Sequence, residues 1–122
     1  MSSAHPNFAA VDAALRALDE GREPARDVLR DATRALLAAL VARAPGRSVE
    51  VRVPPYGAVQ CVAGPRHTRG TPPNVIETDP LTWLRLGTGK LAWSDAVRSG
   101  KVNASGIRAD ISGLLPLVPA AS

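Results

Sequence analysis

The chain has 122 residues, a length typical of one domain, and 45% of them are hydrophobic. The chain has 15 basic and 11 acidic residues, and the arginines from Arg16 to Arg34 alternate with acidic residues. This mixture is typical of an ion-paired, solvated surface and argues against a nucleic-acid-binding stripe. Cys61 is the single cysteine, which excludes an internal disulfide. There is no signal peptide pattern and no apolar run near the roughly 20 residues that span a bilayer, so we expect a soluble, cytoplasmic protein without stable membrane insertion.

Two amphipathic helices are predicted at the start. The first has Asn7 as its N-cap and Gly21 as its stop. Its apolar stripe consists of Phe8, Val11, Leu15 and Leu18. The second runs from Pro24, which suits a first helical turn, to about Arg43. Both helices are expected to pack on the rest of the domain as a preface over residues 1–46.

From Val49 the periodicity changes to that of strands. Val49 to Val53 alternates apolar and polar residues, and Ala58 to Ala63 returns antiparallel after a Pro-Pro-Tyr-Gly turn. Val75 to Thr78 and Lys101 to Ser105 are also predicted strands. The residues with inward phase, together with two near the C-terminus, are mostly small: Val49, Val51, Val53, Val59, Cys61, Val102, Ala104, Leu114 and Leu117.

Short helices are predicted between and after the last two strands. Asp79 followed by Pro80 is an N-cap and first-turn pair that opens a helix through Arg85. Ser94 is expected to cap a second helix over 95–98, and one or two helical turns are expected over 110–115. The glycines that bound these elements are interpreted as caps and turns requiring positive φ: Gly87, Gly89, Gly100 and Gly106.

This order of elements predicts an α+β fold. Hairpin-paired strands with helices grouped between them favour a twisted, mostly antiparallel sheet of four to five strands covered by helices on one face. Residues 1–46 and 47–122 are expected to form a single globular unit.

The segment around Gly89 to Gly106 resembles a known family. Gly89-Lys90-Leu91, then a short helix, then Gly100-Lys101-Val102-Asn103-Ala104-Ser105-Gly106 is similar to the sterol carrier protein family. In that family, an acid-capped helix leads to Gly-Lys-Leu and to a closing strand that begins Gly-Lys-aliphatic. The resemblance covers about residues 47–117, with the second helix as an addition to it, and looks closest to a bacterial branch.

The resemblance implies a non-catalytic domain whose sheet and helices enclose an apolar tunnel for lipids, fatty acyl chains or sterols. The expected tunnel wall consists of Val51, Val53, Val59, Cys61, Trp83, Leu84, Trp93, Val102 and Leu114. An empty, dry tunnel of roughly 300 Å³ would cost about 7 kcal/mol, as much as the whole stability of many domains. We therefore expect a tunnel that is filled by lipid, entered by water or collapsed.

The loop from Arg66 to Asn74 is the least usual stretch. Arg66 and Arg69 are candidates for gripping an anionic head group, with His67 as an acid or base beside them. The alternative is a rigid connection whose side chains bond neighbouring carbonyls, and no nucleophile partner for His67 is identifiable.

Other reactive residues favour structural interpretations. Cys61 has the phase of a buried, inert thiol. Trp83 and Trp93 fit ordinary core packing as well as a tunnel wall. One cysteine and two distant histidines predict no metal site, and no glycine-rich nucleotide motif or other cofactor signature is present.

Three functions remain open at this point. The first is a carrier of an apolar ligand. The second is a scaffold or accessory subunit with a collapsed tunnel, which would dock a protein partner or a second copy through its N-terminal helices. The third is an enzyme that uses His67.

Overall fold

A computed structural model describes residues 8–64 and 74–118. Two helices, α1 (Phe8–Asp19) and α2 (Arg26–Arg43), precede strands β1 (Val49–Val53), β2 (Gly57–Cys61) and β3 (Asn74–Thr78). Helices α3 (Pro80–Gly87) and α4 (Trp93–Arg98), strand β4 (Val102–Ser105) and the short 3-10 helix η1 (Ser112–Leu114) complete the described chain. The predicted α+β class and element order are confirmed.

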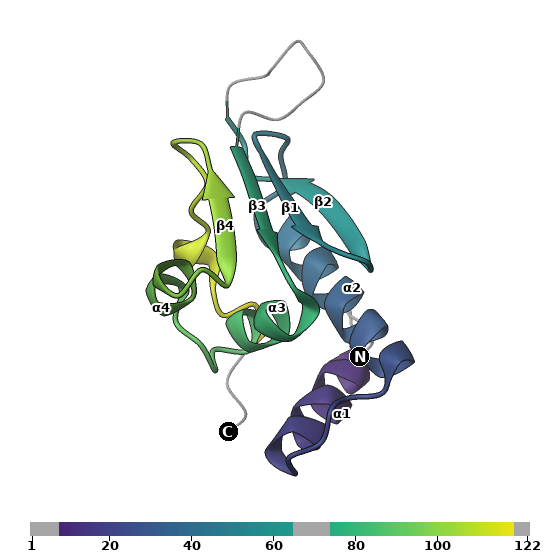
Figure 1. Ribbon diagram of the computed structural model, residues 1–122. Coiled ribbons are helices and arrows are strands. Elements are labelled where there is room, and N and C mark those ends of the chain that lie inside the picture. The colour runs from purple at the N-terminus through teal and green to yellow at the C-terminus, as the bar shows by residue number, and fades with distance from the viewer. Residues whose placement is uncertain (1–7, 65–73, 119–122) are drawn as a thin grey trace.

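The sheet has 4 strands in the order β2-β1-β3-β4. β1 pairs antiparallel with β2 and parallel with β3, and β3 pairs antiparallel with β4. The parallel pair places β1 and β3 at the centre, with the β1–β2 hairpin and β4 at the two edges (Figure 1). The sheet is therefore mixed but mostly antiparallel, as expected.

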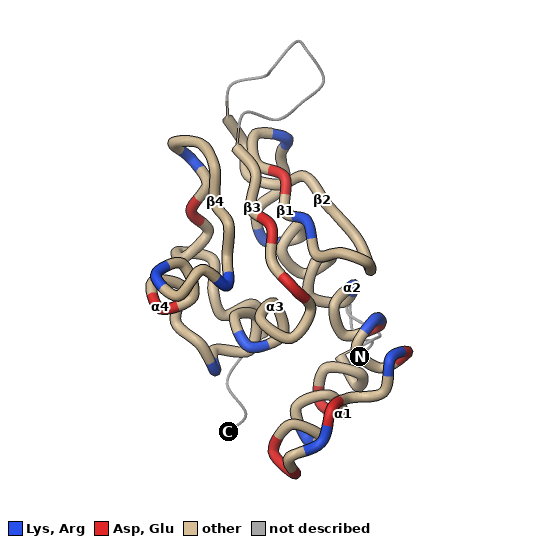
Figure 2. The backbone as a smooth tube through the Cα atoms, in the orientation of Figure 1, with Lys and Arg blue, Asp and Glu red and all other residues tan. Residues whose placement is uncertain are grey.

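Alternation along the strands separates an inner and an outer face. Val49, Val51 and Val53 of β1 are fully buried, while Glu50 and Arg52 between them are only half-buried. The helices pack on the inner side, with α2 behind the sheet in Figure 1. Figure 2 marks charged residues along β1 and β3. Because successive side chains of a strand point to opposite faces, Glu50, Arg52 and Glu77, which alternate with buried residues, lie on the outer face. No helix of the described chain covers that face in Figure 1. Helices on one face are thus confirmed.

Because β4 is an edge strand, residues that point to the inner face of the sheet are less buried there than in the central strands. Ala104 pairs with Ile76 and shares its face of the sheet, yet Ile76 is buried and Ala104 is exposed. A strand with a neighbour on one side only has fewer elements to cover it. Phase alone therefore overestimates burial at this edge.

Helix α3 begins as the sequence predicts. The Asp79 carboxylate accepts the Thr82 backbone N–H at 3.1 Å and the Thr82 hydroxyl at 2.6 Å, and Pro80 occupies the first helical position. Such a cap satisfies backbone donors that the first turn leaves without partners.

The other predicted helix boundaries differ from the structure. α4 begins at Trp93 after Ala92, without a side-chain cap, so the prediction of Ser94 as its cap is wrong. α2 begins at Arg26, two residues after Pro24. The predicted helix over 110–115 is the 3-10 turn η1. Asn7 lies outside the described residues.

The glycine predictions are confirmed except at one position. Gly89, Gly100 and Gly106 have positive φ, whereas Gly87 is helical. A Cβ on Gly87 would lie 3.0 Å from a methyl carbon of Leu36 in α2, so Gly87 permits close approach of α3 to α2. Its role is helix packing.

Candidate functional site

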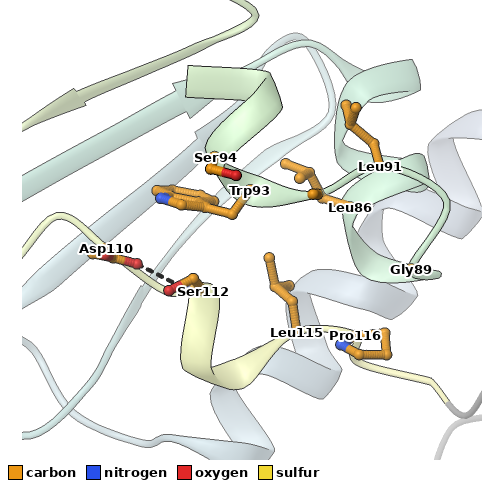
Figure 3. A pocket seen from close by; sticks show the side chains of 10 residues that line it. Leu86, Gly89, Leu91, Trp93, Ser94, Asp110, Ser112, Leu115 and Pro116 are labelled. Carbon is orange, nitrogen blue, oxygen red and sulfur yellow. Dashed lines mark hydrogen bonds between the residues drawn. The ribbon is translucent and has the colours of Figure 1, made fainter. Parts of the chain in front are cut away.

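A pocket lies between the α3–α4 connection and the C-terminal segment. Its volume is about 530 Å³, within the range of small-molecule sites. Figure 3 shows Trp93 facing Asp110, Ser112 and Leu115 across this space. The lining residues are Leu86, Gly89, Leu91, Ala92, Trp93, Ser94, Asp110, Ser112, Leu115 and Pro116. We call this the α4 pocket.

The α4 pocket is apolar at one end and polar at the other. Leu86 is buried, and the other apolar lining residues Leu91, Trp93 and Leu115 are half-buried. Asp110 and Ser112 lie together beside the ring of Trp93 (Figure 3). The arrangement suits a molecule with an apolar body and a polar end.

The C-terminal wall of the pocket is held by Arg43 at the end of α2. Its Nη1 donates to the carbonyl oxygens of Leu114 and Pro116, both at 2.7 Å, and its Nη2 donates to Leu117 O at 3.4 Å. On the same stretch, Leu117 N donates to Gly87 O at 2.8 Å. We call residues 114–118 the strap, because these bonds tie an irregular segment to α2 and α3.

Asp110 supplies a negative charge at the polar end. The Ser112 hydroxyl and backbone N–H both bond its carboxylate and hold the pKa of Asp110 below its ordinary value. The backbone bond, from Ser112 N to Oδ1, is 2.8 Å long (Figure 3). Because a lowered carboxyl pKa keeps the group ionised at neutral pH, the polar end carries a full negative charge.

Two further pockets lie near α1 and α2. One, of about 690 Å³, separates α1 from the Thr88–Lys90 turn. Its walls include Phe8, Val11 and Leu15 and the charged residues Asp12, Arg16, Asp19 and Lys90. A second, of about 330 Å³, is lined by Glu23, Pro24, Arg26, Leu29, Tyr56 and Leu81. We call the first the α1 pocket; it shares Gly89 with the α4 pocket.

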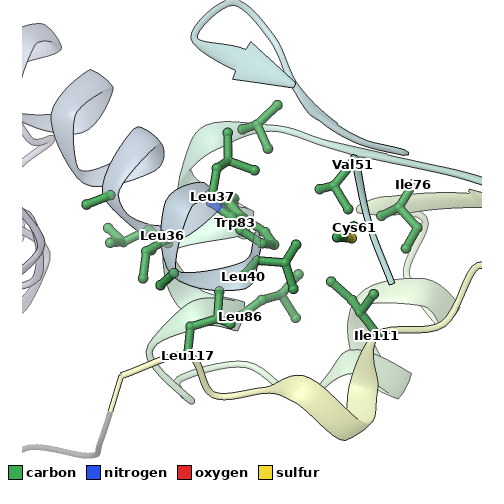
Figure 4. Packing of buried hydrophobic residues seen from close by; sticks show 14 of the residues in the cluster. Leu36, Leu37, Leu40, Val51, Cys61, Ile76, Trp83, Leu86, Ile111 and Leu117 are labelled. Atoms are coloured by element: carbon green, nitrogen blue, oxygen red, sulfur yellow. The ribbon is translucent and has the colours of Figure 1, made fainter. Parts of the chain in front are cut away.

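The residues predicted for a tunnel wall lie mostly in the core. Val51, Val53, Cys61, Trp83 and Leu84 are all 0% exposed. Figure 4 shows Val51 and Cys61 within the same cluster as Leu40, Ile76 and Trp83. Among the nine predicted residues, Trp93 alone lines one of the three pockets described above.

The remaining predicted wall residues surround this core. Val102 is buried at the start of β4, whereas Val59 and Leu114 are half-buried at its margin. Leu114 neighbours the α4 pocket through the strap and contributes its carbonyl to Arg43. The tunnel wall as a whole stays a prediction.

Cys61 and Trp83 have the environments of structural residues. Burial raises the pKa of the Cys61 thiol to about 11, which disfavours the reactive thiolate. Trp83 Nε1 donates to the carbonyl oxygen of Thr33 in α2 at 3.2 Å, so the buried indole is satisfied.

The predicted head-group residues Arg66, His67 and Arg69 lie outside the described residues. The sequence did not single out Asp110, Ser112, Leu86, Leu91 or Leu115 as a site. The sequence offers one indication of this site, Asp110 two residues before Ser112 at the start of a short apolar turn. This pattern usually indicates a helix cap and not a binding site.

Residues 8–64 and 74–118 contain neither a candidate metal site nor a helix suited to cross a membrane. In that part of the chain no three His, Cys, Asp or Glu side chains are grouped to hold a metal ion. None of its helices combines the length and the hydropathy required to traverse a bilayer.

The family comparison agrees with the fold. Residues 25–117 match the family described as bacterial SCP ortholog, well over half of the chain. The match extends further toward the N-terminus than the motif resemblance and includes α2, while α1 lies outside it. No match was found among curated proteins. On the strength of its matched region and its α+β architecture, the chain belongs to the bacterial SCP ortholog family.

Proposed function

We propose that the protein binds and carries a small apolar or amphiphilic molecule in the α4 pocket, without catalysis. The observation that carries this proposal is a pocket of about 530 Å³ whose inner end is made of Leu86, Leu91, Trp93 and Leu115, in a member of a sterol-carrier-like family. Burying these side chains under a ligand would remove apolar surface from water, at about 25 cal/mol per Å².

The location of the proposed site differs from the tunnel implied by the family resemblance. The α4 pocket opens beside the sheet, whereas Val51 and Cys61 pack under it. Ligand entry at the α4 pocket therefore requires no opening of the core. We propose a cytoplasmic location, in keeping with the single buried thiol of Cys61.

Native mass spectrometry of gently purified protein tests the proposal. A co-purified lipid-like adduct that disappears on denaturation, and whose binding Leu115→Asp abolishes, is expected. Leu29→Asp, at the pocket bounded by Tyr56 and Leu81, is the matched control and should leave the adduct in place. A protein without adduct that also fails to bind added fluorescent lipid would contradict the carrier function.

A second function, as an accessory or scaffold subunit, is favoured by α1. This helix packs on α2 but lies outside the matched region, so it is an addition to the family domain. A protein partner or second copy docking there would appear as a stoichiometric complex in native mass spectrometry. Leu15→Asp, in the half-buried wall of the α1 pocket, should dissociate that complex without affecting lipid binding.

The anionic-head-group hypothesis for the Arg66–Arg69 loop remains a separate proposal. If Arg66→Ala and Arg69→Ala weaken the binding of an anionic lipid far more than that of a neutral lipid, the loop takes part in binding. Equal affinities would remove it from the site.

A further inference from the structure

The polar end of the α4 pocket carries charge of one sign. Its lining contains one ionisable side chain, Asp110, and two hydroxyls, Ser94 and Ser112. Among the ten described residues that form its wall there is no lysine, arginine or histidine. A ligand whose head group reaches this end meets a carboxylate.

The nearby cations of residues 8–64 and 74–118 have partners or positions away from Asp110. Arg43 is bonded to three carbonyls of the strap, and Lys90 lines the α1 pocket. Arg108, two residues before Asp110, extends toward Gly64, since its Nη1 lies 3.1 Å from the position of a Cβ there. Arg98 pairs with Asp95 at 2.8 Å. These contacts leave the charge of Asp110 available to a ligand.

The Asp110 carboxylate retains acceptor capacity. Oδ1 receives the Ser112 N–H, and a carboxylate offers about four lone-pair sites over its two oxygens. Asp110 is exposed, so a ligand group can approach it from the pocket. Its bond to the backbone N–H of Ser112, at the start of η1, and a role in binding are therefore compatible.

Trp93 adds a second element that attracts positive charge. Its ring is half-buried and lies opposite Asp110 and Ser112 in Figure 3. A cation over an indole face is stabilised by the ring quadrupole, and tryptophan is the best aromatic for this contact. An aromatic ring with a carboxylate beside it suits an ammonium group.

One opposing feature is the N-terminus of α4, because Ala92, Trp93 and Ser94 at the start of this helix line the pocket. A helix N-terminus carries at most about half a positive charge. α4 has only 6 residues, and Asp95 in its first turn offsets that partial charge. The full charge of Asp110 therefore outweighs it.

We propose that the α4 pocket selects amphiphiles with a positively charged head group, an ammonium on an apolar tail, bound by the Asp110 carboxylate and the Trp93 ring. This selectivity rests on the proposed function and narrows its ligand class. Fatty acids, whose carboxylate would face Asp110, are disfavoured.

The test compares three ligands that share one tail: decyltrimethylammonium, decanol and decanoate, each below its micellar concentration. Binding is followed by quenching of tryptophan fluorescence, assigned to the pocket by its loss in Trp93→Phe, and checked by equilibrium dialysis. The ammonium compound should bind most tightly and decanoate most weakly. Asp110→Asn should lower the affinity for the ammonium compound about threefold to fivefold and leave the affinity for decanol unchanged.

Two further variants make the result specific. Asp110→Glu keeps the charge and should keep the ammonium preference, and unchanged decanol binding shows that the pocket is intact in each variant. Asp12→Asn removes a carboxylate from the α1 pocket and should change none of the affinities.

The proposal is overturned if decanoate binds as tightly as the ammonium compound, if Asp110→Asn has no effect, or if Asp12→Asn has the effect instead. Retained decanol binding in those cases would leave the carrier function standing. Failure of all three ligands to bind would reject both proposals together.

Discussion

The side chains beneath the sheet and those beside α4 are similarly apolar but are packed differently. Under the sheet, Val51, Val53 and Trp83 are wholly inaccessible to solvent. Beside α4, Trp93 and Leu115 are only half-buried and leave a pocket. A regular sheet lets small β-branched side chains meet the leucines of α2 closely, whereas the strap after Leu114 has neither helical nor strand regularity to close against α4. Composition therefore does not decide where a cavity forms; the backbone that carries the side chains does.

The largest difference in stability is expected when each of the two tryptophans is replaced by alanine in turn. Trp83→Ala should lower the free energy of unfolding by about 3–5 kcal/mol, because it leaves a cavity in the core and removes the bond to Thr33 O. Trp93→Ala should lower the free energy of unfolding by less than about 2 kcal/mol, since its ring is only half-buried, but should remove ligand binding. Urea denaturation measures both. Similar losses of stability would mean that the two regions are packed alike.

A smaller effect is expected from releasing the strap. Arg43→Ala removes three hydrogen bonds to the carbonyls of Leu114, Pro116 and Leu117 and should cost about 1–2 kcal/mol, because the guanidinium is largely exposed. Ligand affinity should fall too, since Leu115 and Pro116 lose their fixed position.

Arg34→Ala is the matched control for the strap. Arg34 also lies in α2 and donates from Nε to a carbonyl at 2.9 Å, but that carbonyl belongs to Tyr56 in the β1–β2 turn and not to the strap. Arg34→Ala should lower the free energy of unfolding by about 0.5 kcal/mol and leave ligand affinity unchanged. If the two variants weaken binding equally, Arg43 does not position the pocket wall.

The sequence predicted the regular part of the molecule well. Alternation in β1, the Asp79-Pro80 pair and the Gly89 to Gly106 segment correctly indicated the strands, α3 and the family. These features depend on local spacing, which a single sequence displays directly.

The pocket could not be predicted in the same way. It brings together Leu86, Trp93 and Leu115 from three segments, and the last of these is placed by Arg43, more than 70 residues earlier. Inward strand phase pointed to Val51 and Cys61 as a ligand wall, but phase does not distinguish a side chain that packs tightly from one that borders a cavity.

The cap of α3 should contribute about 1 kcal/mol to the free energy of unfolding, because it holds the first turn of the helix that carries Trp83 into the core. Although burial alone would raise the pKa of Asp79, hydrogen bonds from the Thr82 side chain and backbone outweigh it and lower the pKa. The stabilisation should therefore be complete above the unfolded-state pKa of about 3.9 and disappear as pH falls through the lower folded-state pKa.

Urea denaturation of the wild type and of Asp79→Asn across this pH range measures the contribution of the cap. The difference between them should vanish in strong acid and reach a plateau by about pH 5. A difference that grows toward acid pH would contradict the assigned direction of the pKa shift. Ligand affinity at neutral pH should change little, since Asp79 does not line the α4 pocket.

The smallest expected effect concerns Cys61, which reports whether a ligand enters the core. With its pKa raised to about 11, the native thiol should be alkylated at pH 8 about a hundredfold more slowly than an unfolded one, from ionisation alone. A ligand in the α4 pocket should leave this rate nearly unchanged, apart from the general slowing that binding to the native state produces by mass action. Iodoacetamide labelling followed by mass spectrometry measures the rate with and without decanol. If the ligand accelerates labelling, the side chains beneath the sheet open to admit the ligand. Val51, Val53 and Cys61 would then line a tunnel, as the family resemblance implies.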